Sequence, residues 1–582
     1  MSSQCKYIYG SALLSLLCCV PTVHAGSPDI ERIAPKDVPS SAAGEIIHDE
    51  LPEVLTGSDR EAVLVEALKG LVFIDEPEEL DPAGRPDASG IVIHKFDVPD
   101  QADFEQRFQS FLQQPVSLYL LDQITREVVR FYREHDHPVV DALALEGQDI
   151  TEGVVQIAVI LGKRGEVKVE GAEHFSEEKL ASTIRLQEGE TITLTPLEQD
   201  IAWLNNNPFR SVDVLFERGE AFGQTDIVLD VEDRYPLRVY GGVEDSGTEI
   251  SGKQRWLGGF NWGNAFGLDH QLNYQFTSSF ETRELNAHSF NYAAPLPWRH
   301  TATLFGVYVE SDPGRDVAGF KLDGTNYQLG LRYAIPLPKY WQLNQELVLG
   351  YDFKRSNNNL EFGGLSVFST FTNVSQFSFA YNASLEDPWG ATGLDSTLYF
   401  SPGSMMSDNE DAEFTASRAF ASADYVYARI GLNRLTRLPW DFSWVAELEF
   451  QLSNKNLLGS EQFGVGGYQT VRGYDEYQAV GDEGILIKNE IRTPALALLK
   501  HLNIEVPEEQ LQFLWFFDYG SVKNVDLLTG EGGSDLMSTG IGLRYSIAPY
   551  FTLRADYGWQ LKALTTNTDR ESRLHAGFVL AY

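Results

Sequence analysis

The sequence predicts a membrane β-barrel of about sixteen antiparallel strands, preceded by two small α+β domains. Three observations predict this fold. A short apolar run near the N-terminus has the features of an export signal. Residues 91–234 alternate twice between short strands and amphipathic helices. From residue 235 onward, segments of about ten residues alternate strictly between apolar and polar side chains.

The composition argues against several classes of protein. The chain has 582 residues, with 84 Asp and Glu against 45 Lys and Arg, so its formal net charge is −39. Such acidity argues against nucleic acid as a partner, because nucleic-acid binding needs basic surface. The mean hydropathy of −0.22 argues against a bundle of apolar transmembrane helices. Aromatic residues make up 12% of the chain, far more than a disordered chain carries.

Residues 1–25 are expected to be a signal peptide. Residues 11–20 are apolar but too few to span a bilayer core about 30 Å thick, and the small-x-small pattern that ends at Ala25 is typical of a signal-peptidase site. We expect cleavage between Ala25 and Gly26. All three cysteines precede this site, so the mature chain would have none, which suits an oxidising compartment.

Residues 26–90 are predicted to be a periplasmic linker, because they are rich in proline, serine and acidic residues. One apolar island interrupts them at residues 61–74. Its pattern fits a short helix or a strand equally well, so the sequence leaves its structure open.

Residues 91–163 and 164–234 are predicted to form two domains with the same order of elements: a strand, two helices and two strands. In the first, Phe104 and Phe108 share one helical face. In the second, Ser176 stands where a helix N-cap is expected. Each unit spans about 70 residues, which indicates a tandem repeat of one small α+β domain.

Residues 235–582 are predicted to form the barrel. The segment 551–560 places Tyr557 and Trp559 on one face and Arg554 and Asp556 on the other. The polar face suits a lumen and the aromatic face suits lipid, whereas a soluble sandwich would carry fewer aromatic residues.

The connections between barrel segments largely alternate between short and long, as expected for the two ends of an outer-membrane barrel. Tight turns are expected at 265–267, 297–300, 336–339 and 548–550, and long connections near 311–324, 354–369, 403–420, 453–481 and 521–535. The connection 495–508 is the exception, because it is long where a short turn is expected. Phe578 and Tyr582 lie on one face of the last strand, and we expect them to be the C-terminal signal for a barrel-assembly machinery.

No motif for catalysis, phosphate binding or a cofactor is found, so we expect no enzyme activity, no cofactor and no metal. His135 and His137 are spaced like metal ligands, but they lie at a predicted helix end, where imidazole complements the helix dipole. We therefore interpret this pair as structural.

The longest predicted outer loop contains a glycine-rich segment at residues 464–482. Its central motif is Val471, Arg472, Gly473 and Tyr474. An arginine buried in a barrel lumen needs a carboxylate partner. The alternative is an exposed arginine on a flexible loop.

The strand alternation of segment 511–520 supplies a candidate partner. It turns Phe516, Asp518 and Gly520 toward the lumen. We therefore predict that Asp518 pairs with Arg472 and holds the loop inside the pore.

These two motifs resemble the paired loop and strand motifs of two-partner secretion transporters. These are the haemolysin and filamentous-adhesin secretion/activation proteins, a branch of the outer-membrane assembly factor superfamily. The resemblance covers residues 91–582, and the segment 146–171 also fits it. It implies two polypeptide-transport-associated (POTRA) domains, a barrel of about sixteen strands, and a long loop that folds into the barrel and pairs Arg472 with Asp518.

The resemblance also implies the function. We expect a translocation pore in the outer membrane of a Gram-negative bacterium, with the POTRA domains in the periplasm. These domains would bind an unfolded partner exoprotein as an added strand or in a helix groove. The pore would export this adhesin-like or cytolysin-like protein, encoded nearby, with its activation as a further role. Other expected partners are outer-membrane lipid and the barrel-assembly machinery.

Two alternatives remain. The first is an assembly insertase of the same superfamily, although such relatives usually carry more than two periplasmic domains. The second is a passive porin or ligand-gated receptor, which has no need of chaperone-like repeats. Some relatives carry a pore-plugging helix near the N-terminus, and the island at residues 61–74 is not clearly that helix.

Overall fold

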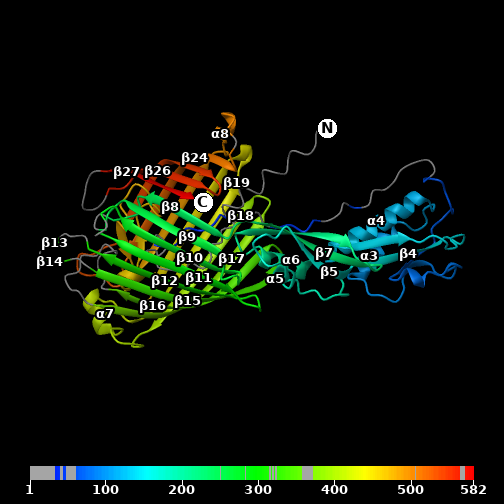
Figure 1. The fold of residues 1–582 in the computed structure, drawn as a ribbon, viewed down its shortest axis with the longest axis horizontal. Helices are drawn as coiled ribbons and strands as arrows, with labels where there is room; N and C mark the ends of the chain where they lie inside the picture. Colours follow the sequence, from blue (N-terminus) through cyan, green and yellow to red (C-terminus); the bar gives the residue numbers. More distant parts are fainter. Residues whose placement is uncertain are drawn as a thin grey trace. The chain divides into compact units, whose positions relative to one another are not determined.

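The structure is a computed structural model that describes residues 33–39, 44–47, 51, 60–248, 251–281, 284–312, 316–317, 320–321, 324–356, 371–504, 506–563 and 570–582. These residues fall into two compact units (Figure 1). One unit contains the chain from Tyr235 to Tyr582 together with residues 33–39, and the other contains the described residues between 44 and 234. No helix in the described part of the chain is long and apolar enough to cross a membrane.

The first α+β domain is built on a four-stranded sheet in the order β2-β1-β4-β3. Its elements are β1 (Gly70–Ile74), the 3-10 turn η1 (Pro77–Glu79), β2 (Gly90–Ile93), α3 (Gln101–Gln109), α4 (Leu118–Glu134), β3 (Val140–Ala144) and β4 (Val154–Leu161). Phe104 and Phe108 of α3 are fully buried against Phe73 of β1, with ring centroids 4.8 and 5.0 Å away. The predicted apolar face of α3 therefore supplies the core of this domain.

The predicted start of this domain at residue 91 is wrong. Strand β1 pairs in parallel with both β2 and β4, so it lies inside the sheet, and all five of its residues are buried. Strand β1 is the C-terminal part of the apolar island at residues 61–74. This part of the island is therefore a core strand of the domain. The island resembles a linker element in sequence because residues 75–89, rich in proline and acidic side chains, separate it from the rest of the domain.

The second α+β domain follows the predicted order of elements. It contains β5 (Lys163–Glu170), α5 (Glu177–Ala181), α6 (Leu194–Leu204), β6 (Arg210–Arg218) and β7 (Gln224–Asp233). Ser176 caps α5 by accepting a hydrogen bond from the Lys179 amide at 3.4 Å. The sheet order is β5-β7-β6, which places β6 at an edge.

Residues 44–47 pair with this β6 edge, although the sequence predicted them to be linker. The Val214 amide donates to the Glu45 carbonyl at 2.9 Å, and the Ile47 amide donates to the Val214 carbonyl at 2.9 Å. The segment therefore adds a short parallel strand to the sheet. An exposed edge strand leaves backbone groups unpaired, which gives a physical reason for a neighbouring segment of the chain to dock there.

Sixteen strands of the unit from Tyr235 to Tyr582 close into one antiparallel barrel, as predicted. In order around the barrel they are β8 (Leu237–Glu244), β9 (Arg255–Ala265), β10 (His270–Ser279), β11 (Asn286–Pro295), β12 (Thr301–Ser311), β15 (Gly324–Tyr340), β16 (Leu343–Ser356), β17 (Thr372–Asp387), β18 (Gly390–Pro402), β19 (Asp424–Arg437), β20 (Ser443–Ser453), β23 (Glu483–Arg492), β24 (Glu509–Lys523), β25 (Ser534–Ile547), β26 (Phe551–Gln560) and β27 (Ser572–Ala581). Pairing of β27 with β8 closes the ring. The connections contain a small hairpin of β13 (Asp316–Val317) and β14 (Phe320–Lys321), helix α7 (Asp411–Ser417) and the 3-10 turn η2 (Pro439–Asp441).

The turns at the barrel end where the chain enters β8 are mostly short, and six of them carry an exposed aromatic side chain. We call these residues the rim aromatics: Phe266, Trp298, Trp341, Trp389, Trp440 and Tyr550. Turns lie at 265–267, 297–300 and 548–550 as expected. The turn predicted at 336–339 is wrong, because these residues continue β15 and the chain turns at Trp341 instead. Prolines suggested the turn, but they stand at the strand margin, where the pairing with β16 becomes irregular.

Residues 33–39 lie inside the barrel, and we call them the strap. The Ile33 side chain is 2% exposed and packs in an apolar cluster with luminal residues of β11 and β12. The Lys36 ammonium donates to Glu244 of β8 at 2.8 Å, and the Lys36 carbonyl accepts from Asn261 of β9 at 3.0 Å. The predicted linker at 26–90 is therefore wrong here too, because an apolar residue and a paired lysine let this segment dock in the lumen.

His135 and His137 lie at the end of α4, as predicted. One ring nitrogen of His135 is 2.7 Å from the Phe131 carbonyl, and the two rings stack at 4.2 Å. His137 packs beside Tyr132. Within the described ranges, no group of three or more His, Cys, Asp or Glu side chains is arranged to hold a metal ion. These contacts fit the structural interpretation of the pair.

Candidate functional site

The long connection between β20 and β23 folds back into the barrel, and we call residues 454–482 the inner loop. It contains the 3-10 turn η3 (Gly459–Glu461) and a hairpin of β21 (Phe463–Val465) with β22 (Ala479–Gly481). Near its tip, the Val471, Arg472 and Tyr474 side chains have no exposed surface. The alternative of an exposed arginine on a flexible loop is therefore excluded.

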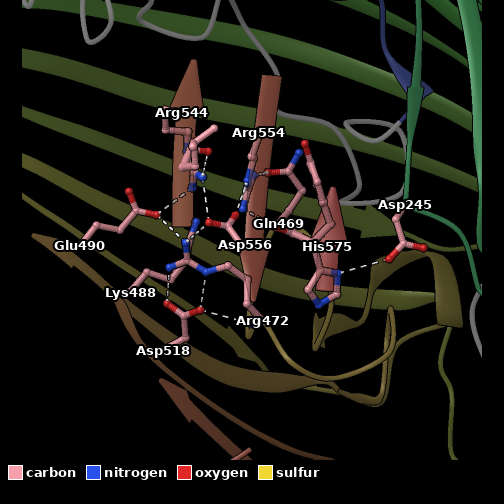
Figure 2. Close-up of polar contacts among 12 residues, drawn as sticks. Asp245, Gln469, Arg472, Lys488, Glu490, Asp518, Arg544, Arg554, Asp556 and His575 are labelled. Atoms are coloured by element: carbon pink, nitrogen blue, oxygen red, sulfur yellow. Dashed lines mark hydrogen bonds and ion pairs between the residues drawn. The ribbon is translucent and has the colours of Figure 1, made fainter. Parts of the chain in front are cut away.

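Arg472 forms a bidentate ion pair with Asp518 of β24 (Figure 2). Its Nε lies 2.7 Å from Oδ2 and its Nη2 lies 2.8 Å from Oδ1. The Arg472 amide also donates to Oδ2 at 3.1 Å. The guanidinium carbon is 3.6 Å from the ring centroid of Phe516, which covers one face of the cation. The structure thus brings together the motif residues that the sequence predicted to meet.

Further charged side chains extend this pair into a network. Glu490 of β23 lies 2.6 Å from Arg472 Nη1, and Asp556 of β26 lies 3.6 Å from it. Arg544 bridges these two carboxylates, at 3.2 Å from Glu490 and 2.8 Å from Asp556. Arg554 holds the other oxygen of Asp556 at 2.7 Å, as Figure 2 shows.

We call this cluster the lock network. Its members are Arg472, Glu490, Arg492, Asp518, Arg544, Arg554 and Asp556. The strands that carry the wall residues are neighbours, from β23 to β26. Because buried charges are tolerated only when they are paired and hydrogen-bonded, the network fixes the loop tip against one sector of the wall.

Gly473 lets the loop tip approach the wall closely. Its φ is 93°, and an added Cβ would lie 3.0 Å from backbone atoms of Gly558 on β26. Its amide donates to His575 Nε2 at 3.1 Å, and its carbonyl accepts from Gln560 Nε2 at 2.8 Å. Glycine meets both the conformational and the spatial requirement at this position.

The other motif residues pack around this contact. The Tyr474 hydroxyl lies 2.9 Å from the Met537 carbonyl and 2.5 Å from the Lys562 carbonyl. Val471 belongs to an apolar cluster with the β21 hairpin and the wall. A Cβ on Gly520 would come within 2.8 Å of the Val471 side chain, so this inward glycine of β24 makes room for the loop.

The start of the inner loop is anchored to a different sector of the wall. Glu461 is buried, with 1% of its surface exposed. It accepts from Lys354 of β16 at 2.7 Å, from Gln376 of β17 at 3.0 Å and from Tyr427 of β19 at 2.9 Å. The loop is therefore bound to β16–β19 at its first turn and to β23–β26 at its tip.

The end of the inner loop has a third anchor at Asp482. Its carboxylate accepts from Arg418 at 2.7 and 3.1 Å and from the Leu457 amide at 2.9 Å. Arg418 follows α7 in the β18–β19 connection. This pair joins the inner loop to a neighbouring outer loop.

Sequence reasoning missed Glu490, Glu461 and Lys354 and did not connect Asp556 to the loop. Alternation gives part of the missing signal, because Glu490 occupies the same face of β23 as Lys488, opposite to the face of the outward Ile491. It cannot say which luminal face meets the loop, because that depends on how the barrel closes.

The remaining predicted site residues have separate outcomes. Ala25 and Gly26 lie outside the described residues. Phe578 is on the outer wall, and Tyr582 is 94% exposed while its backbone pairs with Val239 of β8 at 2.9 Å. Their role as an assembly signal stays a prediction.

Comparison with known families agrees with this architecture. Residues 223–545, more than half of the chain, match the family described as haemolysin secretion/activation protein ShlB/FhaC/HecB. Residues 163–234 match the POTRA family, described as surface antigen variable number repeat. The first match contains the inner loop and all of β24, and hence both Arg472 and Asp518.

Similar proteins are transporters by name. Heme/hemopexin transporter protein HuxB from Haemophilus influenzae is 22% identical over 477 residues, which cover 79% of this chain and 81% of that protein. Outer membrane transporter CdiB-2 from Burkholderia pseudomallei is 23% identical over 435 residues, covering 72% and 69%.

Two solved structures share the fold. CdiB from Escherichia coli superposes with a TM-score of 0.69 at 16% identity, and CdiB from Acinetobacter baumannii with a TM-score of 0.59 at 16% identity; each match covers 95% of both chains. Together with the family match over the barrel and its inner loop, these findings identify the chain. It belongs to the haemolysin secretion/activation protein family, the outer-membrane transporters of two-partner secretion.

Proposed function

We propose that the inner loop is a lock that an exported partner protein must displace to pass through the barrel. The observation that carries this proposal is the buried Arg472–Asp518 pair, with contacts of 2.7 and 2.8 Å inside the lumen. Breaking such a pair one side at a time leaves an uncompensated charge, which costs about 3–5 kcal/mol. The loop therefore stays in place until something replaces its contacts.

The two POTRA domains are the proposed capture site for the unfolded partner. An extended polypeptide can add to an exposed sheet edge through main-chain hydrogen bonds. The β6 edge accepts a strand in this way, since residues 44–47 already pair with Val214 at 2.9 Å. We propose that a partner segment replaces residues 44–47 at this edge.

The partner proposed for this chain is an adhesin-like or cytolysin-like exoprotein encoded nearby. The relatives support a transported partner in general terms, since HuxB is named as a heme/hemopexin transporter. The sequence has no ATP-binding motif, so folding of the partner outside the cell is the proposed driving force.

Further proposed partners are outer-membrane lipid along the aromatic outer wall and a barrel-assembly machinery that recognises Phe578 and Tyr582. We also propose removal of residues 1–25 on export.

The test is secretion of the nearby-encoded exoprotein by cells that carry Arg472→Ala or Asp518→Ala. We expect the barrel to assemble, as judged by heat-modifiable mobility, while the exoprotein stays in the periplasm, because the loop is still held at Glu461 and Asp482 but its tip no longer has the defined position from which the partner displaces it. Arg130→Ala is the matched control, because Arg130 also pairs with carboxylates but is half exposed on α4 of the first domain. Unchanged secretion in the Arg472→Ala strain contradicts the lock. Loss of other barrels from the outer membrane of a deletion strain would favour the insertase.

A further inference from the structure

The connection between β23 and β24 differs from the other turns at its end of the barrel. The sequence singled it out as too long, and it carries no aromatic residue, whereas six neighbouring turns carry the rim aromatics. It contains a short helix, α8 (Leu498–His501). Four of its apolar side chains are 42–68% exposed: Leu496, Leu498, Leu502 and Ile504.

This connection is held in a fixed shape. The Glu509 carboxylate accepts from the Leu499 amide at 2.8 and 3.1 Å, and the Tyr545 hydroxyl donates to it at 3.0 Å. Leu496 and Leu511 exchange two backbone hydrogen bonds of 2.8 Å each. The exposed leucines therefore stand on a braced scaffold, so their exposure is a property of the fold.

The apolar surface of the connection continues the outer wall of the barrel. On β23 and β24, the outward side chains of Ile491, Phe513 and Trp515 are 41–49% exposed, as lipid-facing residues of a membrane barrel are. Figure 1 shows α8 standing out from the wall beside β24. Aromatic residues in the neighbouring turns mark the same end as a membrane–water interface.

We propose that the β23–β24 connection is a membrane-surface anchor that buries these four apolar side chains in the periplasmic leaflet of the outer membrane. Short segments with an apolar face and basic flanks lie in the interface region of a bilayer in this way. Lys500 and His501 follow the first leucines of α8 and are exposed, so the lysine stem can lie along the acyl chains while its ammonium reaches lipid phosphate.

The position of the anchor connects it to the lock network. It joins the two strands that carry the carboxylates closest to Arg472, with Glu490 on β23 and Asp518 on β24. An anchor at this turn holds that sector of the wall at a fixed depth while the inner loop is displaced. The proposed anchor therefore stabilises the barrel wall and does not bind the exported protein.

The test measures the depth of residue 502 in a bilayer. Full-length Leu502→Cys transporter, labelled with an environment-sensitive fluorophore, is reconstituted into phosphatidylethanolamine/phosphatidylglycerol vesicles that carry nitroxide lipids. Leu143→Cys is the matched control, because Leu143 is also an exposed leucine (41%) but lies in the first POTRA domain. We expect a blue-shifted emission at 502, quenching by headgroup-proximal nitroxide that is several-fold stronger than at 143, and protection from aqueous iodide.

Other occupants of this surface give different results. A label at 502 that is quenched by iodide as strongly as the label at 143 overturns the proposal. A label that is shielded from iodide but not quenched by nitroxide lipids also overturns it, because a protein then covers the surface.

As a second measurement, a label at Leu496→Cys is compared with and without Leu498→Glu and Leu502→Glu. We expect the two glutamates to reduce lipid quenching several-fold in barrels that retain heat-modifiable mobility, and unchanged quenching contradicts the anchor.

Discussion

Lys354 and Glu461 form a buried ion pair of 2.7 Å, with side chains that are 7% and 0% exposed, between strand β16 and the first turn of the inner loop. This pair involves a sector of the wall that the lock network does not reach. The inner loop is therefore held as a bridge with separate charged anchors, and displacing it requires that each of them be exchanged.

Glu461→Gln should loosen the start of the inner loop. The substitution leaves Lys354 buried without its carboxylate, which costs about 3–5 kcal/mol. We expect faster protease cleavage within residues 454–482 of the folded barrel and a reduced temperature for heat-induced unfolding. Glu483→Gln is the control, since Glu483 pairs with a lysine that is 67% exposed. Adding Lys354→Met should recover part of the loss, and a double variant no better than the single one would contradict this explanation.

Gly473→Ala should release the loop tip without touching a charge. A Cβ here meets the Gly558 backbone at 3.0 Å, and a side chain at φ 93° adds about 1–3 kcal/mol of strain. Gly530→Ala is the control, because Gly530 has φ 91° with no atom within 4 Å of an added Cβ and lies in another connection, between β24 and β25. Cysteine accessibility at the loop tip is the measurement. Equal accessibility in both variants would show that glycine at position 473 is not needed to hold the loop tip.

Glu490→Gln should destabilise the lock network, although the ion pair between Arg472 and Asp518 remains. Glu490 lies within 2.6 Å of Arg472 and of Arg492 and 3.2 Å from Arg544, so its loss leaves three cations with less compensating charge. We expect a lower barrel melting temperature and lower secretion than for Glu447→Gln. Glu447 is the control because it pairs with Lys488 and its side chain is 26% exposed. Identical behaviour of the two variants would mean that Arg472 depends on Asp518 alone.

Ile47→Pro should expose the β6 edge. The Ile47 amide donates to Val214 at 2.9 Å, and proline has no amide hydrogen to donate. Residues 44–47 compete with a partner as an intramolecular ligand, at an effective concentration of order millimolar, so their release should raise partner affinity about tenfold or more. Binding of the exoprotein's N-terminal segment to the purified transporter is the measurement, with Ile47→Ala as control. Equal affinities for the two variants would exclude competition at this edge.

Sequence pattern alone predicted much of the fold and the centre of the site. Strict alternation predicted the barrel strands, because a wall with lipid outside and polar lumen inside leaves a period of two in every strand. The same alternation turned Asp518 inward, and the need of a buried guanidinium for a carboxylate connected it to Arg472. Local rules were sufficient for Asp518 because it lies on a strand whose register the pattern fixes, whereas Arg472 lies in the inner loop and was connected to it only through its need for a carboxylate.

The missed features depend on contacts between distant segments. Val72 and Phe73 belong to a central strand, but proline-rich residues isolate them in sequence and only pairing with β4 reveals their place. Lys36 and Glu461 are charged residues in segments without periodicity. Their partners, Glu244 and Lys354, are 208 and 107 residues away, and closure of the barrel decides that they meet.

The strap has a consequence for how the barrel is made. Residues 33–39 are enclosed by a ring that the pairing of β27 with β8 completes. The strap contacts the earliest strands, with Glu244 on β8, Asn261 on β9 and the apolar cluster on β11 and β12. A segment bound to the still-open half of the sheet becomes enclosed when the last strand arrives, so the N-terminus need not be threaded through a finished ring. These contacts allow the strap to dock on the first strands before the seam between β27 and β8 closes.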